Sequence, residues 1–249
     1  NKILEQYLKD KGISASDIFV NYTPFGHSDW SKIVSDVVAL GADGKKVGVI
    51  STINGDANIG FYKELAAANI SADKIPVVAF SVGEEELSGL DTSNLVGHLA
   101  AWNYFQSAES DINSEFIKAW KARMGNKRVT NDPMEAHYIG FNMWANAVKQ
   151  AGTTNVDAVR TAMYGQKFPN LTGGTAEMLT NHHLSKPVLI GEIKADGQFD
   201  IISQTEPVPG DAWTDFLAES AVLKSDWKGL GCGMYNTNTK TCIQLKSNY

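Results

Sequence analysis

Hydrophobic positions in the first 105 residues follow two alternating spacings. Apolar residues three and four positions apart predict helices, which fall at residues 3–8, 30–38 and 59–68. Short unbroken apolar runs predict strands, which fall at residues 18–22, 47–52 and 77–81. Unbroken apolar strands are typical of a parallel sheet that is covered on both faces, with right-handed crossovers between its strands. The pattern therefore predicts an α/β layer built on a parallel sheet.

The pattern becomes mainly helical after residue 105. Amphipathic spacing predicts two helices with apolar positions at 116–120 and 138–148, the second starting at Asn131-Asp132-Pro133, and a third helix at 156–163. Residues 187–202 contain the dipeptide Asp196-Gly197 between two apolar runs, which predicts a β-hairpin. The chain after Pro207 is rich in loop residues.

Two predicted elements lack a partner in this pattern. The chain opens in a helix that no strand precedes, and the helices within residues 116–148 have no predicted sheet to cover. Either the missing sheet comes from elsewhere, or these helices pack as a small bundle.

Composition and charge exclude several classes of protein. The 249 residues are 43% hydrophobic and 20% charged, as expected of a folded globular protein. The formal net charge of -6 argues against a nucleic-acid partner, because binding to phosphates is driven by Lys and Arg. No run approaches the roughly 20 apolar residues that span a bilayer. The N-terminus lacks the layout of a signal peptide, so we expect an export signal to have been removed or to lie upstream.

The two cysteines, Cys232 and Cys242, flank a polar segment that is rich in turn residues. Their spacing suits a disulfide-closed hairpin, which predicts an oxidising compartment such as the periplasm. The alternative is a pair of reduced cysteines in the cytosol. A zinc site would need two further ligands at matching spacing, and neither a Cys nor a His lies nearby.

Polar residues follow two neighbouring strands, where parallel sheets bind ligands. After the strand at 47–52, Asn54 and Asp56 offer amide and carboxylate groups, and Gly55 lets a ligand approach the backbone. Asp56 and the nearby Asn58 could instead serve only to cap the next helix. Asn54 lies nearer the strand end and is therefore the better ligand candidate.

A second set of candidates lies at the end of the strand at 77–81. Ser81 ends this strand, and Gly83 and Glu84 follow it closely. We expect the Glu84 carboxylate to point into a crevice, where it can accept two N–H groups from one planar ligand. Glu85 and Glu86 are better explained as acidic residues at the positive end of a helix dipole.

The chain carries none of the usual sequence signatures of catalysis or of cofactor binding. It has no nucleophile elbow, no phosphate-binding glycine loop, no His-Glu-x-x-His motif and no dinucleotide fingerprint. We therefore expect no cofactor, no metal site and no catalytic residues.

Five stretches of the chain resemble the urea and short-chain-amide binding proteins of ABC transporters. They are Tyr22–Trp30, Ser51–Lys63, Phe80–Leu87, Asp132–Ala136 and Ile193–Phe199. The C-terminal cysteine hairpin resembles the urea-binding branch in particular. The resemblance implies a type I periplasmic binding protein, in which two Rossmann-like lobes joined by three crossing strands close on a ligand.

The resemblance also implies a division of the chain. It implies a second-lobe α/β domain over 1–105, a mainly helical remainder of the first lobe over 106–186, a hairpin returning to the second lobe over 187–206, and a tail with the disulfide hairpin over 207–249. Family members carry about one more domain before the residue matching Asn1, so we expect an N-terminal segment that another chain could supply.

The predicted function is a periplasmic receptor that delivers urea or a short amide to an inner-membrane ABC permease. Its expected ligand groups are Asn54, Gly55, Asp56, Ser81, Gly83 and Glu84. There are two alternatives. One is a cytoplasmic amide-sensing regulator of the same fold, which reduced cysteines would favour, and the other is an enzyme that acts on a small amide.

Overall fold

The computed structural model describes residues 1–42, 44–211, 214, 216–217, 220, 234–236 and 241–243, the last two segments by their backbone alone. The chain divides into two compact units. The smaller unit comprises residues 1–33 and 211–249, and the larger comprises residues 34–210.

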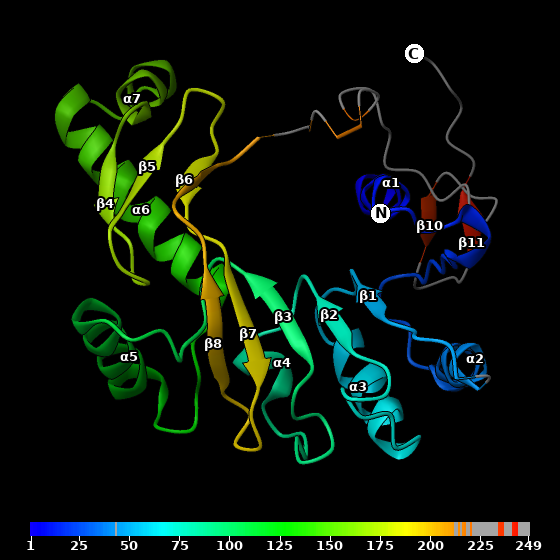
Figure 1. The fold of residues 1–249 in the computed structure, drawn as a ribbon. Helices are drawn as coiled ribbons and strands as arrows, with labels where there is room; N and C mark the ends of the chain where they lie inside the picture. Colours follow the sequence, from blue (N-terminus) through cyan, green and yellow to red (C-terminus); the bar gives the residue numbers. More distant parts are fainter. Residues whose placement is uncertain are drawn as a thin grey trace. The chain divides into compact units, whose positions relative to one another are not determined.

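A five-stranded sheet organises one part of the larger unit (Figure 1). Its strands, in spatial order, are β1 (Val49–Ser51), β2 (Val77–Ala79), β3 (Leu99–Trp102), β7 (Leu189–Ile193) and β8 (Phe199–Gln204). The first three run parallel, and β7 and β8 add an antiparallel hairpin. The predicted parallel α/β layer is confirmed, as is the hairpin, whereas β3 is a strand that the hydrophobic pattern does not predict.

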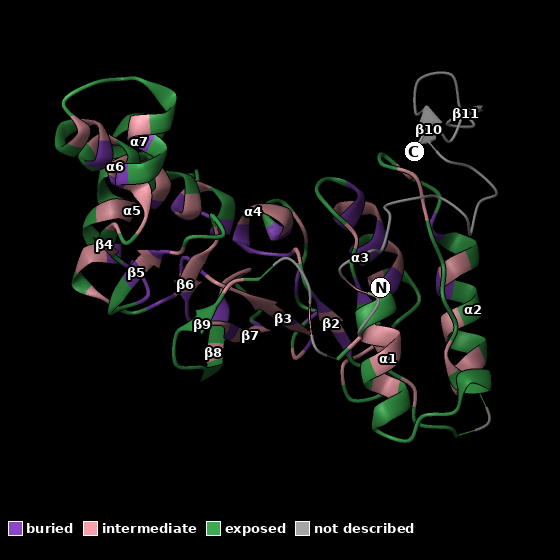
Figure 2. Cartoon of the chain, turned by 90° about the horizontal axis from the view of Figure 1, so that it is seen from above, coloured by how far each residue is buried: buried purple, intermediate pink, exposed green. Residues whose placement is uncertain are grey.

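The helices of this layer are α2 (Ser31–Gly41), α3 (Ala57–Ala67) and the short α4 (Glu84–Leu87). The first turn of α2 belongs to the smaller unit. Phe61, Tyr62 and Leu65 of α3 are almost completely buried, and Figure 2 shows buried residues along α3 and β2. Just after α3, Asn69 has a positive φ of 53°, a left-handed conformation that ends helices. The predicted helix over 59–68 is confirmed, with its last residue at Ala67.

A second, antiparallel sheet has the order β4-β5-β6-β9 and lies with three further helices. Its strands are β4 (Lys167–Pro169), β5 (Thr175–Met178), β6 (Leu184–Lys186) and β9 (Val208–Pro209), and the helices are α5 (Asp111–Met124), α6 (Asp132–Ala151) and α7 (Val156–Met163). Ile139 and Met143 of α6 form a buried cluster with Ala176 and Met178 of β5. The alternative of a helix bundle is therefore wrong, because α6 packs on a sheet whose strands are too short to give a clear pattern in the sequence.

The chain passes three times between the two sheets. The connections are residues 103–110 between β3 and α5, residues 187–188 between β6 and β7, and residues 205–207 between β8 and β9. The last two are joined, because Val188 N–H donates to Thr205 Oγ1 at 2.9 Å and Thr205 N–H donates to the Val188 carbonyl at 2.9 Å. The predicted boundaries at 105, 186 and 206 fall in or beside these connections, and the assignment of the segments to lobes stays a prediction.

The smaller unit contains α1 (Lys2–Asp10), the 3₁₀ turn Ala15–Asp17 and a hairpin of β10 (Met234–Asn236) and β11 (Thr241–Ile243). The predicted strand at 18–22 is wrong, because no strand in the described part of the chain pairs with it. The predicted cysteine hairpin has strand pairing on both sides of its turn, with Tyr235 opposite Cys242. Cys232 and the side chain of Cys242 lie outside the described residues, so the disulfide stays a prediction.

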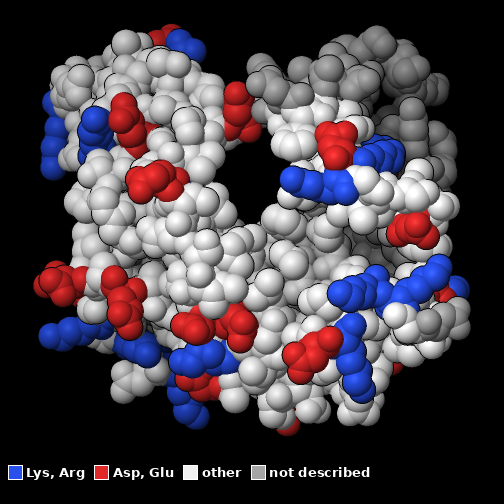
Figure 3. All heavy atoms as spheres, in the orientation of Figure 1, with Lys and Arg blue, Asp and Glu red and all other residues white. Residues whose placement is uncertain are grey.

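The surface drawn in Figure 3 carries acidic and basic side chains interspersed with neutral ones. Among the residues that the structure describes, no helix combines the length and the apolar character needed to cross a bilayer.

Candidate ligand-binding site

The loops after β1 and β2 are joined by one buried side chain, Asn58. Its Nδ2 lies 3.0 Å from the Ile53 carbonyl, 3.2 Å from the Gly55 carbonyl and 3.2 Å from the Ser81 carbonyl. Asn58 has no exposed surface, and two N–H groups are shared among three acceptors. The structure thus brings the two predicted loops together at the carboxyl ends of the strands, where ligands bind in parallel sheets.

The first loop presents its polar groups to solvent. Asn54, Gly55 and Asp56 are all exposed. Gly55 has a φ of +63°, a conformation that few other residues adopt, and its Cα faces open space. Asp56 is the residue before α3, yet its side chain makes no capping hydrogen bond. Capping through the Asp56 side chain, the alternative explanation of this residue, is therefore wrong.

The second loop packs against an aromatic residue. A Cβ on Gly83 would lie 3.4 Å from the ring of Trp102, so the missing side chain lets the indole approach the backbone. Trp102 ends β3 and is half-buried, as is Ser81. The hydrophobic pattern misses β3 and therefore misses Trp102, which adds an aromatic face to the same edge of the sheet.

Glu84 is placed differently from Asn54. It begins α4, its exposed fraction is 1%, and its Oε1 accepts hydrogen bonds from the backbone N–H and the hydroxyl of Ser107, both at 3.1 Å. Within the described residues its Oε2 has no hydrogen-bond donor. Burial raises the pKa of Glu84 to about 7, although the bonds from Ser107 oppose that rise. One carboxylate oxygen is thus bound within the protein, and the other is buried without a hydrogen-bond donor among the described residues.

The two acidic residues after Glu84 have structural partners. Glu86 Oε2 accepts a hydrogen bond of 2.8 Å from the Gly83 N–H at the start of α4, and burial raises its pKa. Glu85 forms a partly exposed ion pair with Arg128 at 3.3 Å. The prediction that these carboxylates support the start of a helix is confirmed for Glu86.

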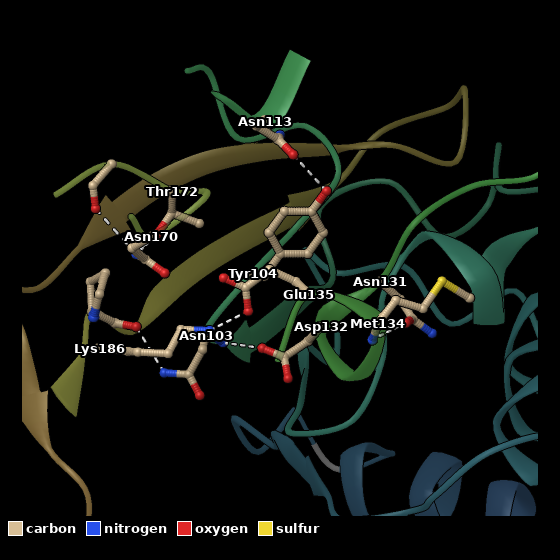
Figure 4. A network of polar contacts seen from close by, with 12 residues as sticks. Asn103, Tyr104, Asn113, Asn131, Asp132, Met134, Glu135, Asn170, Thr172 and Lys186 are labelled. Atoms are coloured by element: carbon tan, nitrogen blue, oxygen red, sulfur yellow. Dashed lines mark hydrogen bonds and ion pairs between the residues drawn. The ribbon is translucent and has the colours of Figure 1, made fainter. Parts of the chain in front are cut away.

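A buried polar network lies beside this edge, where β3 leads out of the sheet (Figure 4). Asn103 N–H donates to Asp132 at 3.0 Å, and Asn103 Nδ2 donates to the Pro187 carbonyl at 2.8 Å. Lys186 pairs with Glu135, both almost completely buried. Burial raises the pKa of Asp132 and of Glu135, while the Lys186 charge opposes that rise. This network fixes two of the connections between the sheets.

Among the residues that the structure places, no three His, Cys, Asp or Glu side chains are grouped to hold a metal ion. The groups at this edge are hydrogen-bonding side chains, glycine backbone and an indole face. Such a set suits the recognition of a small polar molecule.

A parallel sheet with polar loops at its carboxyl ends, joined by three connections to a second sheet, is the architecture of a type I periplasmic binding protein. The chain belongs to the periplasmic binding protein domain family, whose model matches residues 1–219.

Solved structures of several ABC-transporter proteins are similar to this chain. An amino acid substrate-binding protein from Pseudomonas fluorescens is 18% identical, with a TM-score of 0.65 over 87% of this chain and 56% of that chain. A solute-binding protein from R. palustris, in complex with 4-hydroxybenzoate, is 18% identical, with a TM-score of 0.65 over 75% of this chain and 51% of that chain. A leucine-binding protein from Thermotoga maritima is 15% identical, with a TM-score of 0.58 over 75% of this chain and 51% of that chain. These likenesses establish the fold.

A curated protein named limonene hydroxylase, from Geobacillus stearothermophilus, is 33% identical over 134 residues. The match covers 53% of this chain and 24% of that protein. This chain thus spans about a quarter of that relative and about half of the solved proteins.

Proposed function

We propose that this chain forms one wall of the ligand cleft in a periplasmic receptor that captures urea or a short-chain amide for an ABC permease. The observation that carries the proposal is the joining of the β1 and β2 loops by Asn58, because it holds the candidate groups on one edge of the sheet. The five stretches that resemble urea and amide receptors include both loops and support the choice of ligand.

The proposed ligand matches the chemistry of this edge. Urea and short amides are planar, with N–H donors on one side and a carbonyl acceptor on the other. The Asp56 carboxylate and the Ser81 hydroxyl can accept hydrogen bonds from the ligand N–H groups. The side-chain amide of Asn54 can either donate to the ligand carbonyl or accept from a ligand N–H. Backbone groups at Gly55 and Gly83 can approach the ligand closely, and one oxygen of the buried Glu84 carboxylate has no donor among the described residues. Trp102 offers a flat apolar surface on which a planar ligand can stack.

The proposed mechanism is capture by closure without bond breaking. The ligand binds one lobe first, and its remaining polar groups then favour the closed form over the open one. The three connections between the two sheets would carry that motion, and the closed form would dock on the permease. The family of receptors to which the chain belongs supports transport rather than turnover.

Calorimetric titration of the intact protein with urea, acetamide, formamide, leucine and 4-hydroxybenzoate tests the ligand class. Binding of urea or an amide without hydrolysis supports the proposal. Exclusive binding of leucine or of the aromatic acid would contradict the amide assignment, and release of ammonia would identify an enzyme.

Asn58→Asp tests the position of the site. A carboxylate cannot donate to the three carbonyls, so the two loops should separate, and the amide affinity should fall at least about tenfold. Asn142→Asp is the matched control, because Asn142 also donates to a carbonyl, that of Tyr138 at 2.8 Å, but lies on the surface of α6. Equal effects of the two variants would contradict the proposed site.

A further inference from the structure

The loop after β1 contains Asn54-Gly55, the one Asn-Gly pair of the sequence. The pair lies between the end of β1 and the start of α3, and both of its residues are exposed. Gly55 has a φ of +63°, and a Cβ added there would meet no atom within 4 Å. The pair is therefore open to solvent, in a turn that is part of neither a helix nor a strand.

The Asn54 side chain is not held by the described residues. Other asparagines use their side-chain amides within the protein, as Asn142 does when it donates a hydrogen bond of 2.8 Å to the Tyr138 carbonyl. In the described part of the chain, no hydrogen bond reaches the Asn54 side chain or the Gly55 N–H. These two groups can therefore approach each other.

The two groups can react with each other without a catalyst, because they are held next to each other in one chain. The Gly55 backbone nitrogen attacks Cγ of Asn54, and a five-membered succinimide ring forms. The new bond joins Gly55 N to Asn54 Cγ, the bond from Cγ to Nδ2 breaks, and Nδ2 leaves as ammonia with the proton of the Gly55 N–H. Glycine suits this attack because it has no side chain to crowd the nitrogen.

Water then opens the ring at either of its carbonyl carbons. Addition at Cγ breaks the new bond and leaves an aspartyl residue at position 54. Addition at the main-chain carbonyl carbon leaves an isoaspartyl residue instead, in which the main chain runs through Cγ. Either route consumes water and releases ammonia, so the reaction needs no oxidant, reductant or cofactor.

We propose that Asn54-Gly55 is a site of spontaneous deamidation in the folded protein. Three conditions coincide there: an unhindered nitrogen, an asparagine amide without a partner in the described chain, and a turn that is open to water. Asn126 is also exposed and lies in a turn, but the next residue is Lys127, whose side chain crowds the attacking nitrogen. Asn126 therefore serves as an internal reference for the rate at position 54.

The isoaspartyl product changes the loop that Asn58 holds. Asn58 Nδ2 lies 3.0 Å from the Ile53 carbonyl and 3.2 Å from the Gly55 carbonyl, and these two carbonyls flank position 54. An isoaspartyl residue adds a carbon atom to the main chain between them, so Asn58 cannot keep both bonds at their present geometry. The aspartyl product keeps the length of the main chain and adds only a charge. The isoaspartyl product alone therefore loosens the join between the two loops.

This inference goes beyond the proposed capture of an amide, because all the reacting atoms except those of water belong to the chain. The test is incubation of the intact protein in mildly alkaline buffer, followed over time by peptide mapping with mass spectrometry. An isoaspartyl methyltransferase serves as the probe that distinguishes the isoaspartyl from the aspartyl product.

Conversion at position 54 should be several-fold faster than conversion at Asn126. The rate at position 54 should also rise with pH, because the nucleophile is the deprotonated Gly55 nitrogen. Retention of the Asn54 amide, or conversion no faster than that of Asn126, would overturn the proposal.

A variant and a matched control locate the reaction. Gly55→Ala adds a methyl group that meets no atom within 4 Å but crowds the nitrogen, so the rate at position 54 should fall to about that of Asn126. Gly152→Ala is the control for backbone strain, because Gly152 has a φ of +64° and equally open surroundings. It should leave the rate at position 54 unchanged. Fast conversion in Gly55→Ala, or equal slowing in Gly152→Ala, would overturn the assignment.

The effect on the loops is measured by the side-chain amide NMR signals of Asn58. The incubated protein should show a second set of these signals, which corresponds to the isoaspartyl form. Asn54→Asp introduces the charge without the additional carbon and should not show that set. Identical Asn58 signals in the incubated protein and in Asn54→Asp would contradict the loosening of the loops.

Acetamide separates this inference from the proposed function. An amide bound at this edge covers Asn54 and should slow the conversion. If position 54 converts and acetamide neither binds nor slows it, the proposed function fails alone. If acetamide binds and position 54 keeps its amide in the free protein, the deamidation site fails alone.

Discussion

Lys186 and Glu135, 51 residues apart in the sequence, form an ion pair whose side chains are 6% and 0% exposed. Lys186 comes from the end of β6, and Glu135 lies in the first turns of α6. The Lys186 charge also acts on Asp132, which holds the Asn103 backbone. One cation therefore compensates two buried carboxylates at the connections between the sheets.

Replacing Lys186 should be strongly destabilising. Lys186→Met leaves Glu135 buried without a counter-charge, and the free energy of unfolding should fall by about 3–5 kcal/mol in urea denaturation. Lys167→Met is the matched control, because Lys167 pairs with Glu177 at 3.3 Å in an exposed setting, where ion pairs contribute little. Similar stability of the two variants would show that the buried pair is not structurally important.

Glu84 should make stability depend on pH. Its folded pKa is raised from 4.5 to about 7, so the native state keeps its proton to higher pH than the unfolded state. The associated stability is complete below pH 4.5 and is lost as the pH rises to 7. The difference in unfolding free energy between wild type and Glu84→Gln should therefore fall by up to about 3 kcal/mol across that range. A constant difference between pH 4.5 and 7.5 would show that Glu84 does not titrate there.

His98 should make stability depend on pH in the opposite direction to Glu84. Its Nδ1 accepts the Val77 N–H at 3.1 Å, and Nε2 lies 3.3 Å from the Ile70 carbonyl. Burial lowers its pKa from 6.5, so the unfolded state takes up a proton first and stability falls as the pH drops below 6.5. His98→Ala should remove this acid sensitivity and cost about 1–3 kcal/mol near neutral pH through its unpaired partners. Thermal unfolding from pH 5 to 8 measures both effects, with His137→Ala as the control for replacing an exposed histidine.

The sequence predicted the elements with strong periodicity and missed those fixed by tertiary contacts. The helices from 30–38 and 59–68 and the strands at 47–52 and 77–81 were evident because their apolar positions repeat at clear spacings. The strand at 99–102 was missed because its run is short and ends in Trp102, Asn103 and Tyr104, which are mixed in polarity. The segment at 18–22 has the composition of a strand, but no strand in the described part of the chain pairs with it. Composition alone therefore predicts a strand that does not form.

The candidate site was predictable only in part. That polar residues follow β1 and β2 could be inferred from the order of strands and loops, since parallel strands end on one edge. The joining of the loops by Asn58 could not be inferred from the sequence, because the hydrogen bond from Asn58 to Ser81 links residues 23 positions apart. The direction of the Glu84 carboxylate depends on Ser107, another contact between distant residues. Local sequence carries no signal for either contact.

Gly191 tests the packing between β7 and the segment after β3. A Cβ there would lie 2.8 Å from the Phe199 ring and 3.0 Å from the Phe105 ring. Gly191→Ala should therefore cost about 1–3 kcal/mol through overpacking. Gly140→Ala in α6 is the contrasting change, because its added Cβ meets no atom within 4 Å and alanine favours a helix by about 1 kcal/mol. Urea denaturation should show opposite signs, and a stabilised Gly191→Ala would contradict the packing described.

In the proposed function, the joined loops after β1 and β2 form one wall of a site for a small amide. The most direct measurement is a titration of the intact, isotope-labelled protein with acetamide, followed by the backbone amide NMR signals. We expect the signals of Asn54, Gly55, Ser81 and Gly83 to shift together and to saturate with a common dissociation constant. Saturable shifts confined to other parts of the chain, with these four signals unmoved, would contradict the proposed site.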